Sequence, residues 1–217
     1  MKLPRTYFIP GLGADRRLFK GLRRQGWEFE VLEFMAPEKD ETLESYGKRM
    51  AQRIDDSEPF LLGGVSLGGM VSMEACKHVR PEHVILISSV KNRRELPFYF
   101  KAFRYLPVQK ALPAHWFKLI APKNPFPMAA DDRAILEGMR RDMDFEFVKW
   151  AVNAVVNWRN KEVPENLIHI HGTRDLMFPP VLLGEHTKLK KGSHVMVLDR
   201  AEDLYQMLLD ELRMELE

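Results

Sequence analysis

Three side chains that lie far apart in the chain could together activate a serine hydroxyl. Ser66 lies in the pattern G-V-S-L-G at residues 64–68, Asp175 ends the segment H-G-T-R-D, and His194 ends the segment G-S-H. A serine hydroxyl is a weak nucleophile until a neighbouring histidine accepts its proton, and a carboxylate orients that histidine. These residues therefore predict nucleophilic attack by Ser66, with His194 as the base and Asp175 as the group that orients it.

The residues around Ser66 are typical of a sharp turn between a strand and a helix. Glycine stands two residues before and two residues after the serine, where a crowded turn has no room for side chains. The pattern alone is weak, because it arises by chance in roughly one chain in fifteen of this length when glycine and serine are each about 7% of residues. The alternative interpretation is an ordinary glycine-rich loop between two elements. The choice between the two depends on whether the rest of the chain supplies the other residues that a serine nucleophile needs.

Two backbone N–H groups are needed to stabilise the oxyanion that forms when a serine attacks a carbonyl carbon. One belongs to the residue after the nucleophile, which is Leu67. We assign the other to Leu12 in the P-G-L-G loop at residues 10–13, because this loop follows the first predicted strand. Gly11 allows the backbone to approach closely, so it is also a candidate substrate contact.

Strands that alternate with helices would position these residues. Apolar runs predict six strands, at residues 6–9, 29–34, 60–65, 84–87, 167–170 and 187–189. Amphipathic runs predict helices at residues 14–24, 43–54, 67–78 and 201–215. This alternation is typical of an α/β protein with a parallel sheet that helices cover on both faces. Ligands bind beyond the carboxyl ends of such strands, and Ser66, Asp175 and His194 each follow one.

The alternation stops between residues 91 and 160, where no convincing strand is present. Residues 91–161 hold 12 of the 22 aromatic residues, and 14 Lys and Arg against seven Asp and Glu. Helices are predicted at residues 96–106, 108–120, 130–141 and 144–158. We interpret residues 91–160 as a helical cap over the strand ends, and residues 1–90 and 161–217 as the core of a single domain.

Most aromatic residues of the cap are expected to be core, and its basic excess is expected to be a solvated face. Trp150 is a candidate substrate contact, because Phe147 and Ala151 share its predicted helical face and could line a cleft. Three cations follow the fourth strand at the mouth of the site and could instead attract an anionic substrate: Lys91, Arg93 and Arg94.

Other residues could fill two of the proposed roles. Glu95, after the fourth strand, and Asp199 are alternatives to Asp175 as the acid. His171 is closer in sequence to Asp175 than His194 is, but it precedes the acid on strand-like sequence. We therefore expect His169 and His171 to be structural.

These motifs occur in the order found in the α/β-hydrolase superfamily, which the chain resembles along its whole length. The resemblance is closest to short bacterial members described only as hydrolases, and it implies a Ser-His-Asp hydrolase with a helical cap. It also implies about six mostly parallel strands in the order 2-1-3-4-5-6, without the family's N-terminal hairpin. Two features depart from the family: Pro10 stands where many relatives have histidine, and the stretch between Asp175 and the sixth strand is too short for a full crossover helix.

The resemblance implies hydrolysis of a carboxylic ester or thioester of a small, apolar acyl substrate through an acyl-enzyme. Two alternatives use the same three residues: hydrolysis of an amide, peptide or carbon–carbon bond, and a lyase reaction. An alternative of a different class is a ligand-binding or signalling protein that retains the fold.

Composition and charge restrict the setting in which this chemistry would occur. The chain has 217 residues, of which 45% are hydrophobic and 29% charged, as in ordinary globular domains. A formal charge of +2 does not favour nucleic acid or membrane as a partner. The one cysteine, Cys76, is expected to be buried and inert. No signal peptide or membrane span is predicted, so we expect a cytoplasmic protein. We expect a small-molecule substrate, no cofactor or metal, and a monomer or homodimer.

Overall fold

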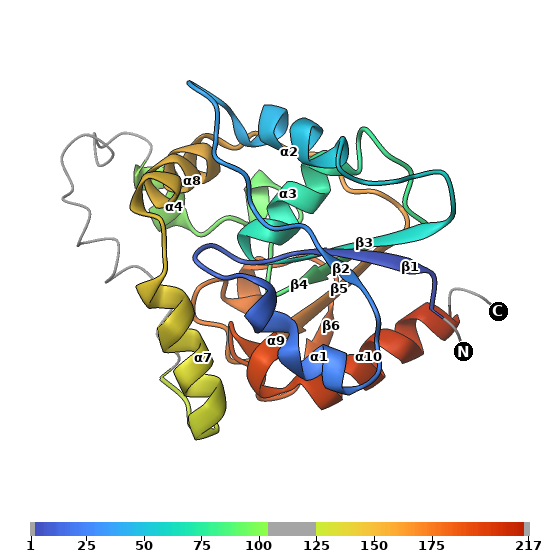
Figure 1. Cartoon of the computed structure of the whole chain (residues 1–217). Helices are drawn as coiled ribbons and strands as arrows, with labels where there is room; N and C mark the ends of the chain where they lie inside the picture. Colours follow the sequence, from blue (N-terminus) through green and yellow to red (C-terminus); the bar gives the residue numbers. More distant parts are fainter. Residues whose placement is uncertain (1–2, 104–124, 215–217) are drawn as a thin grey trace.

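The structure, a computed structural model, describes residues 3–103 and 125–214 and contains one six-stranded sheet (Figure 1). The strand order is β2-β1-β3-β4-β5-β6 and all five strand pairings are parallel, so the predicted order is confirmed. The strands are β1 (Arg5–Ile9), β2 (Glu30–Val31), β3 (Phe60–Val65), β4 (His83–Ile87), β5 (Leu167–Gly172) and β6 (Thr187–Leu189).

Helices cover both faces of the sheet, as Figure 1 shows. One face carries α2 (Leu43–Ala51) and α3 (Leu67–Ala75), and the other carries α1 (Lys20–Arg24), α9 (Met196–Asp199) and α10 (Ala201–Met214). Along β1, Tyr7 and Ile9 belong to the core beneath α2 and α3, whereas Phe8 belongs to the core beneath α1, α9 and α10. Both sets of alternating side chains are thus buried, which is why the strands are continuous apolar runs.

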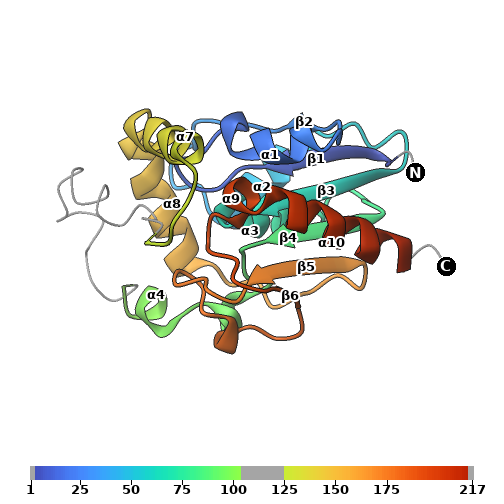
Figure 2. The same cartoon turned by 90° about the horizontal axis from the view of Figure 1, so that it is seen from below.

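The described residues between β4 and β5 form three α-helices: α4 (Phe98–Phe103), α7 (Ala130–Arg141) and α8 (Phe145–Asn157). Figures 1 and 2 show them together at the end of the sheet where the strand arrows point. The helix predicted at residues 108–120 and the end of the helix predicted at 96–106 lie outside the described residues. The boundaries 91 and 160 of the cap stay a prediction.

Tryptophan side chains of α8 and its carboxyl end tie the cap to the core. The Trp158 indole N–H donates to Oε1 of the buried Glu74 on α3 (2.6 Å), and the Trp150 indole N–H donates to the carbonyl oxygen of Glu41 (2.8 Å). The helix begins at an N-cap, Asp144, whose carboxylate accepts the N–H of Glu146 (2.9 Å). Helix α8 is therefore tied to the core at its middle, through Trp150, and at its carboxyl end, through Trp158.

Several elements differ in length from the prediction. Strand β2 has two residues where six were predicted, because only Glu30 and Val31 pair with β1. The helix predicted at 14–24 is split into a 3₁₀ turn, η1 (Arg16–Phe19), and α1, and the Asp15 side chain caps the turn by accepting the N–H of Arg17. Between β5 and β6 there is only the 3₁₀ turn η3 (Pro180–Leu182), as the short stretch predicts.

The first strand begins and the last helix ends on the side of the molecule opposite α7 and α8 (Figures 1 and 2). Among the helices that the structure describes, none has the length and apolar character needed to cross a membrane.

Candidate active site

Ser66 occupies the sharp turn between β3 and α3. Its φ is 52°, a left-handed conformation that is rare for a residue with a side chain and costs about 1–3 kcal/mol. Two hydrogen bonds to the segment around the end of β4 hold the turn: the Ser66 N–H donates to the carbonyl oxygen of Ile87 (3.0 Å), and the Ser66 carbonyl oxygen accepts the hydroxyl of Ser89 (2.7 Å). The neighbouring strand thus stabilises a strained backbone that turns the serine hydroxyl away from the sheet.

The two glycines around Ser66 lie where no side chain fits. A Cβ atom added to Gly64 would lie 2.3 Å from the backbone of Gly68, and one added to Gly68 would lie 2.2 Å from the carbonyl oxygen of Ile9. The first contact closes the strand-to-helix turn. The second contact shows that the loop after β1 packs directly against this turn. The backbone of that loop therefore lies beside Ser66.

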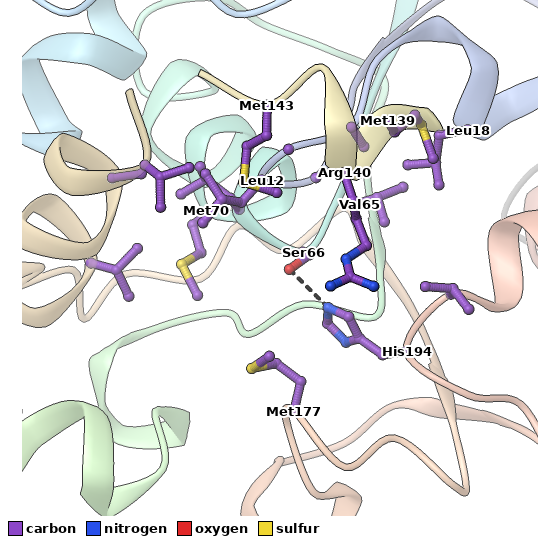
Figure 3. A pocket seen from close by; sticks show the side chains of 18 of the residues that line it. Leu12, Leu18, Val65, Ser66, Met70, Met139, Arg140, Met143, Met177 and His194 are labelled. Carbon is purple, nitrogen blue, oxygen red and sulfur yellow. Dashed lines mark hydrogen bonds between the residues drawn. The ribbon is translucent and has the colours of Figure 1, made fainter. Parts of the chain in front are cut away.

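The structure brings the three candidate catalytic side chains into one hydrogen-bonded row. His194 Nε2 lies 3.0 Å from Ser66 Oγ, and His194 Nδ1 lies 2.8 Å from Asp175 Oδ2 (Figure 3 draws the first bond). The Phe178 ring packs edge-on against the imidazole, with ring centroids 5.5 Å apart. Because each residue follows the carboxyl end of a parallel strand, the sheet itself gathers them.

Asp175 is a buried carboxylate with neighbours at both oxygens. Only 2% of the residue is exposed. Its Oδ1 accepts the N–H groups of Met177 (2.8 Å) and Phe178 (2.9 Å), and Oδ2 faces His194 and, at 3.2 Å, Nε2 of His171. Burial alone would raise the pKa of Asp175, but the two histidines outweigh it and hold the pKa below its ordinary value. The carboxylate therefore stays ionised beside His194.

The two candidate oxyanion donors lie beside the serine. Leu67 is the first residue of α3, so its N–H has no partner within the helix. Leu12 lies in the loop that touches the turn at Gly68, and no hydrogen bond among residues 3–103 and 125–214 uses its N–H. Gly11 comes closer still, since a Cβ atom on it would be 3.5 Å from Ser66 Cβ. Leu12, Leu67 and Gly11 all line the cavity at Ser66.

A largely apolar cavity of about 110 Å³ opens over Ser66 and His194. Figure 3 shows these two side chains together, with methionine and leucine side chains around them. Its walls come from the loop after β1, from α3, from the cap helices and from the loop after β5. Among the apolar residues that line it are Leu12, Leu18, Met70, Leu136, Met139, Met143, Val148, Ala151, Val155 and Met177.

Among the described cap residues, a charged side chain that the sequence analysis missed lines the same cavity. Arg140 lies on α7, and its side chain reaches toward the side of the cavity where Ser66 and His194 lie (Figure 3). The sequence contains a pattern that places Arg140 on this inward face. Leu136, Met139 and Met143 are spaced as one apolar helical face, and Arg140 lies within it. This pattern was hidden by the interpretation of the cap's basic residues as a solvated face.

The structure does not bring Trp150 or Lys91 to the cavity. Trp150 packs against Tyr46, with ring centroids 4.4 Å apart, and its N–H is bound to the Glu41 carbonyl oxygen, so it anchors the cap. Lys91 is buried, donates to the carbonyl oxygen of Glu185 (2.6 Å) and lies 3.3 Å from Glu95. Neither is among the residues that line the cavity.

The alternative acids and histidines have other partners. Glu95 accepts the N–H of Gly184 (2.9 Å) and pairs with Lys91, and Asp199 accepts the hydroxyl of Ser193 (3.3 Å). His169 is buried in β5, where burial first, and then charge interactions with His171 and Lys91, lower its pKa far below the ordinary value. Its neighbour His171 is buried as well and contacts Asp175.

Cys76 and the acidic and histidine side chains of the described residues are the groups that could form a thiol or metal site. Burial raises the pKa of the Cys76 thiol to about 11, so little of it is the reactive thiolate near neutral pH. In the described part of the chain, no cluster of three or more His, Cys, Asp or Glu side chains is placed to hold a metal ion.

The parallel sheet with a serine at the β3–α3 turn defines the class of protein. The chain belongs to the α/β hydrolase family, whose sequence profile matches residues 7–207.

Three solved structures with the same fold share between 14% and 18% of their sequence with this chain. A thermophilic esterase from Thermogutta terrifontis, solved with malate bound, is 17% identical, with a TM-score of 0.72 over 97% of this chain and 89% of that one. MenH from S. aureus is 14% identical, with a TM-score of 0.74 over 100% of this chain and 96% of that one. The enol-lactonase from Burkholderia xenovorans LB400 is 18% identical, with a TM-score of 0.71 over 98% of this chain and 92% of that one. A search of curated proteins found no match.

Proposed function

We propose that this protein hydrolyses a carboxylic ester or thioester with a small acyl group, through an acyl-enzyme intermediate on Ser66. The observation that carries the proposal is the hydrogen-bonded row from Asp175 through His194 to Ser66 at the floor of the cavity. The family and the esterase and enol-lactonase among its structural neighbours are consistent with this chemistry.

The proposed reaction has two halves. In the first, Ser66 Oγ attacks the acyl carbon while His194 Nε2 takes the hydroxyl proton, and His194 then gives that proton to the departing alcohol or thiol. In the second, water attacks the acyl-enzyme with His194 again as the base, and the carboxylic acid leaves. Asp175 accepts a hydrogen bond from His194 Nδ1 throughout, which keeps Nε2 free to face the serine.

The N–H groups of Leu12 and Leu67 would stabilise the oxyanion in both tetrahedral intermediates. Each such donor contributes about 3–4 kcal/mol to transition-state stabilisation in serine hydrolases. The cavity favours a small acyl chain, because its volume of about 110 Å³ is bounded mainly by apolar side chains.

A fluorophosphonate probe tests the proposal, because it modifies only an activated serine. We expect the probe to label the wild-type chain at neutral pH and not to label Ser66→Ala. The same substitution should lower kcat on p-nitrophenyl acetate and butyrate by about 10⁴-fold or more. Ser57→Ala, at an exposed serine, is the matched control and should behave as wild type. An unlabelled wild type, together with equal turnover by both serine variants, would contradict the proposal and favour a ligand-binding protein.

A further inference from the structure

A second cavity adjoins the cavity over Ser66 and His194, which is called the serine cavity below. The second cavity has a volume of about 250 Å³, and the serine cavity has about 110 Å³. Among the described residues, four line both cavities: Gly13, Ala14, Met139 and Met143. The two spaces therefore meet along one wall, which the loop after β1 and the segment around the carboxyl end of α7 form together.

The side chain of Met143 closes this wall against Gly13. A Cβ atom added to Gly13 would lie 2.2 Å from Met143 Cε and 3.3 Å from Met143 Cγ, so the methionine side chain lies directly over the glycine. Figure 3 shows this side chain reaching from the cap toward Leu12. Because Leu12 is the candidate oxyanion donor, Met143 ends the serine cavity near the place where the acyl carbon would react.

The backbone of Met143 is held by the residues on either side of it. The Asp142 carboxylate lies 2.7 Å from Arg17 Nη2, which ties the segment to η1. Asp144 is the N-cap of α8 and accepts the N–H of Glu146 (2.9 Å). A methionine side chain is unbranched and flexible, so the backbone determines where Met143 lies and the side chain determines how far the serine cavity extends.

The second cavity offers apolar surface beyond Met143. The rings of Phe34 and Phe147 both line it, with ring centroids 4.8 Å apart. The acidic side chains of its lining are engaged with other groups: Asp15 and Asp142 pair with Arg17, Glu33 pairs with Arg16, and Asp144 caps α8. The wall next to Met143 therefore suits an uncharged alkyl chain.

We propose that Met143 determines the length of the substrate, because its side chain separates the serine cavity from an apolar space that a longer chain would occupy. The inference rests on the proposed function and assigns the proposed preference for a small group to one side chain. Met143→Ala removes Cγ, Sδ and Cε, which alone would make room for about three more chain atoms. Joining the serine cavity to the second cavity makes room for a longer extension.

Two series of esters test the proposal on the acyl side and on the alcohol side. The acyl series is p-nitrophenyl butyrate, heptanoate and decanoate, and the alcohol series is butyl, heptyl and decyl acetate, followed by release of acid at constant pH. We expect wild type to react more slowly with the longest member of each series than with the shortest. In Met143→Ala, the ratio of kcat/KM for the longest member to that for the shortest should rise by about 100-fold in at least one series, since each buried methylene contributes up to about fourfold.

Two further variants assign the change to the bulk at this position. Met143→Leu keeps most of the side-chain volume and should restore most of the discrimination against the long chain. Met207→Ala on α10 is the matched control, because Met207 is another partly buried methionine and is not among the residues that line either cavity. It should show the wild-type ratio in both series. Thermal melts check that every variant remains folded.

The results separate failure of this proposal from failure of the proposed function. A wild type that prefers the longest ester, or an unchanged ratio in Met143→Ala in both series, overturns the role of Met143 and leaves the hydrolase intact. A gain that stops at the seven-carbon members also overturns it, because the serine cavity would then have grown only by the side chain removed. An equal gain in Met207→Ala has the same consequence. Failure of wild type to react with the fluorophosphonate probe or with any ester overturns the proposed function itself.

Discussion

His171 shows how one buried side chain can fix the geometry of another. Its Nε2 lies 2.9 Å from the carbonyl oxygen of Phe178 and 3.2 Å from Asp175 Oδ2. Both neighbours are acceptors, so this nitrogen must carry a hydrogen. His171 therefore supports Asp175 twice, by facing its carboxylate and by holding the backbone of the loop whose N–H groups bind the other oxygen.

A variant of His171 should affect turnover more than substrate binding. We expect His171→Phe to lower kcat by about tenfold with little change in KM, because removing one buried donor costs about 1–3 kcal/mol and the loop holding Asp175 loosens. His171→Gln, which keeps a donor, should recover part of the loss. Steady-state kinetics across pH 5–9 measure both. Equal kcat in His171→Phe and wild type, or a change in KM alone, would count against a positioning role.

The site residues that could be predicted from the sequence are those whose positions the sheet determines. Ser66, Asp175 and His194 meet because parallel strands bring their carboxyl ends to one edge. Trp150 and Arg140 lie on helices, where periodicity predicts a shared face but not which neighbour that face meets. The face of Trp150 meets Tyr46, and the face of Arg140 meets the cavity.

At the scale of the elements, the contact between the strand-to-helix turn and the loop after β1 leaves no room for a side chain at Gly68. A Cβ atom on Gly68 would lie 2.2 Å from the carbonyl oxygen of Ile9 and 2.3 Å from that of Pro10. These are backbone atoms, so the loop as a whole must move. The loop carries Leu12, and its displacement would move a candidate oxyanion donor away from Ser66.

We expect Gly68→Ala to reduce activity by a larger factor than it reduces stability. The loop can shift at a cost of about 1–3 kcal/mol, whereas loss of the Leu12 N–H lowers kcat by about 10²-fold or more. Gly138→Ala on α7 is the matched control, because its nearest neighbour is the flexible end of the Arg17 side chain, at 3.3 Å. Thermal melts and p-nitrophenyl ester kinetics check both variants. Full activity in Gly68→Ala would contradict this expectation.

The bounds of the strands were predicted with unequal success. Strands β3 and β6 have the predicted bounds, whereas β2 is shorter because only Glu30 and Val31 pair with β1. Helix α9 was not predicted, because four residues are too few for a periodic pattern. Such short elements depend on tertiary contacts that a local sequence pattern does not contain.

At the scale of the whole molecule, the buried Asp175 links stability to pH. Its pKa is lowered in the folded state, so between its folded value and its ordinary value of 3.8 the unfolded chain binds more protons. Its contribution to stability is therefore complete above about pH 5 and decreases as the pH falls through the folded value. The same carboxylate that orients His194 thus helps to hold the loop after β5 at neutral pH.

Urea unfolding of wild type and Asp175→Asn at pH 3–7 measures this contribution. We expect the variant to lose about 1–3 kcal/mol of unfolding free energy at pH 7, and the difference from wild type to shrink as the pH falls below 4. Asp55→Asn, at an exposed carboxylate, serves as the comparison and should cost less at neutral pH because solvent screens its ion pair. A difference that stays constant over the whole pH range would contradict the linkage.

The first strand begins and the last helix ends on the side away from α7 and α8. A bead or sensor chip coupled through a tag at either end would therefore meet the face opposite the cavity, and reagents in the surrounding liquid could still reach Ser66. Immobilised protein should accordingly react with the fluorophosphonate probe at the rate seen in free solution. This orientation makes the chain suitable for surface-based screening of ester libraries.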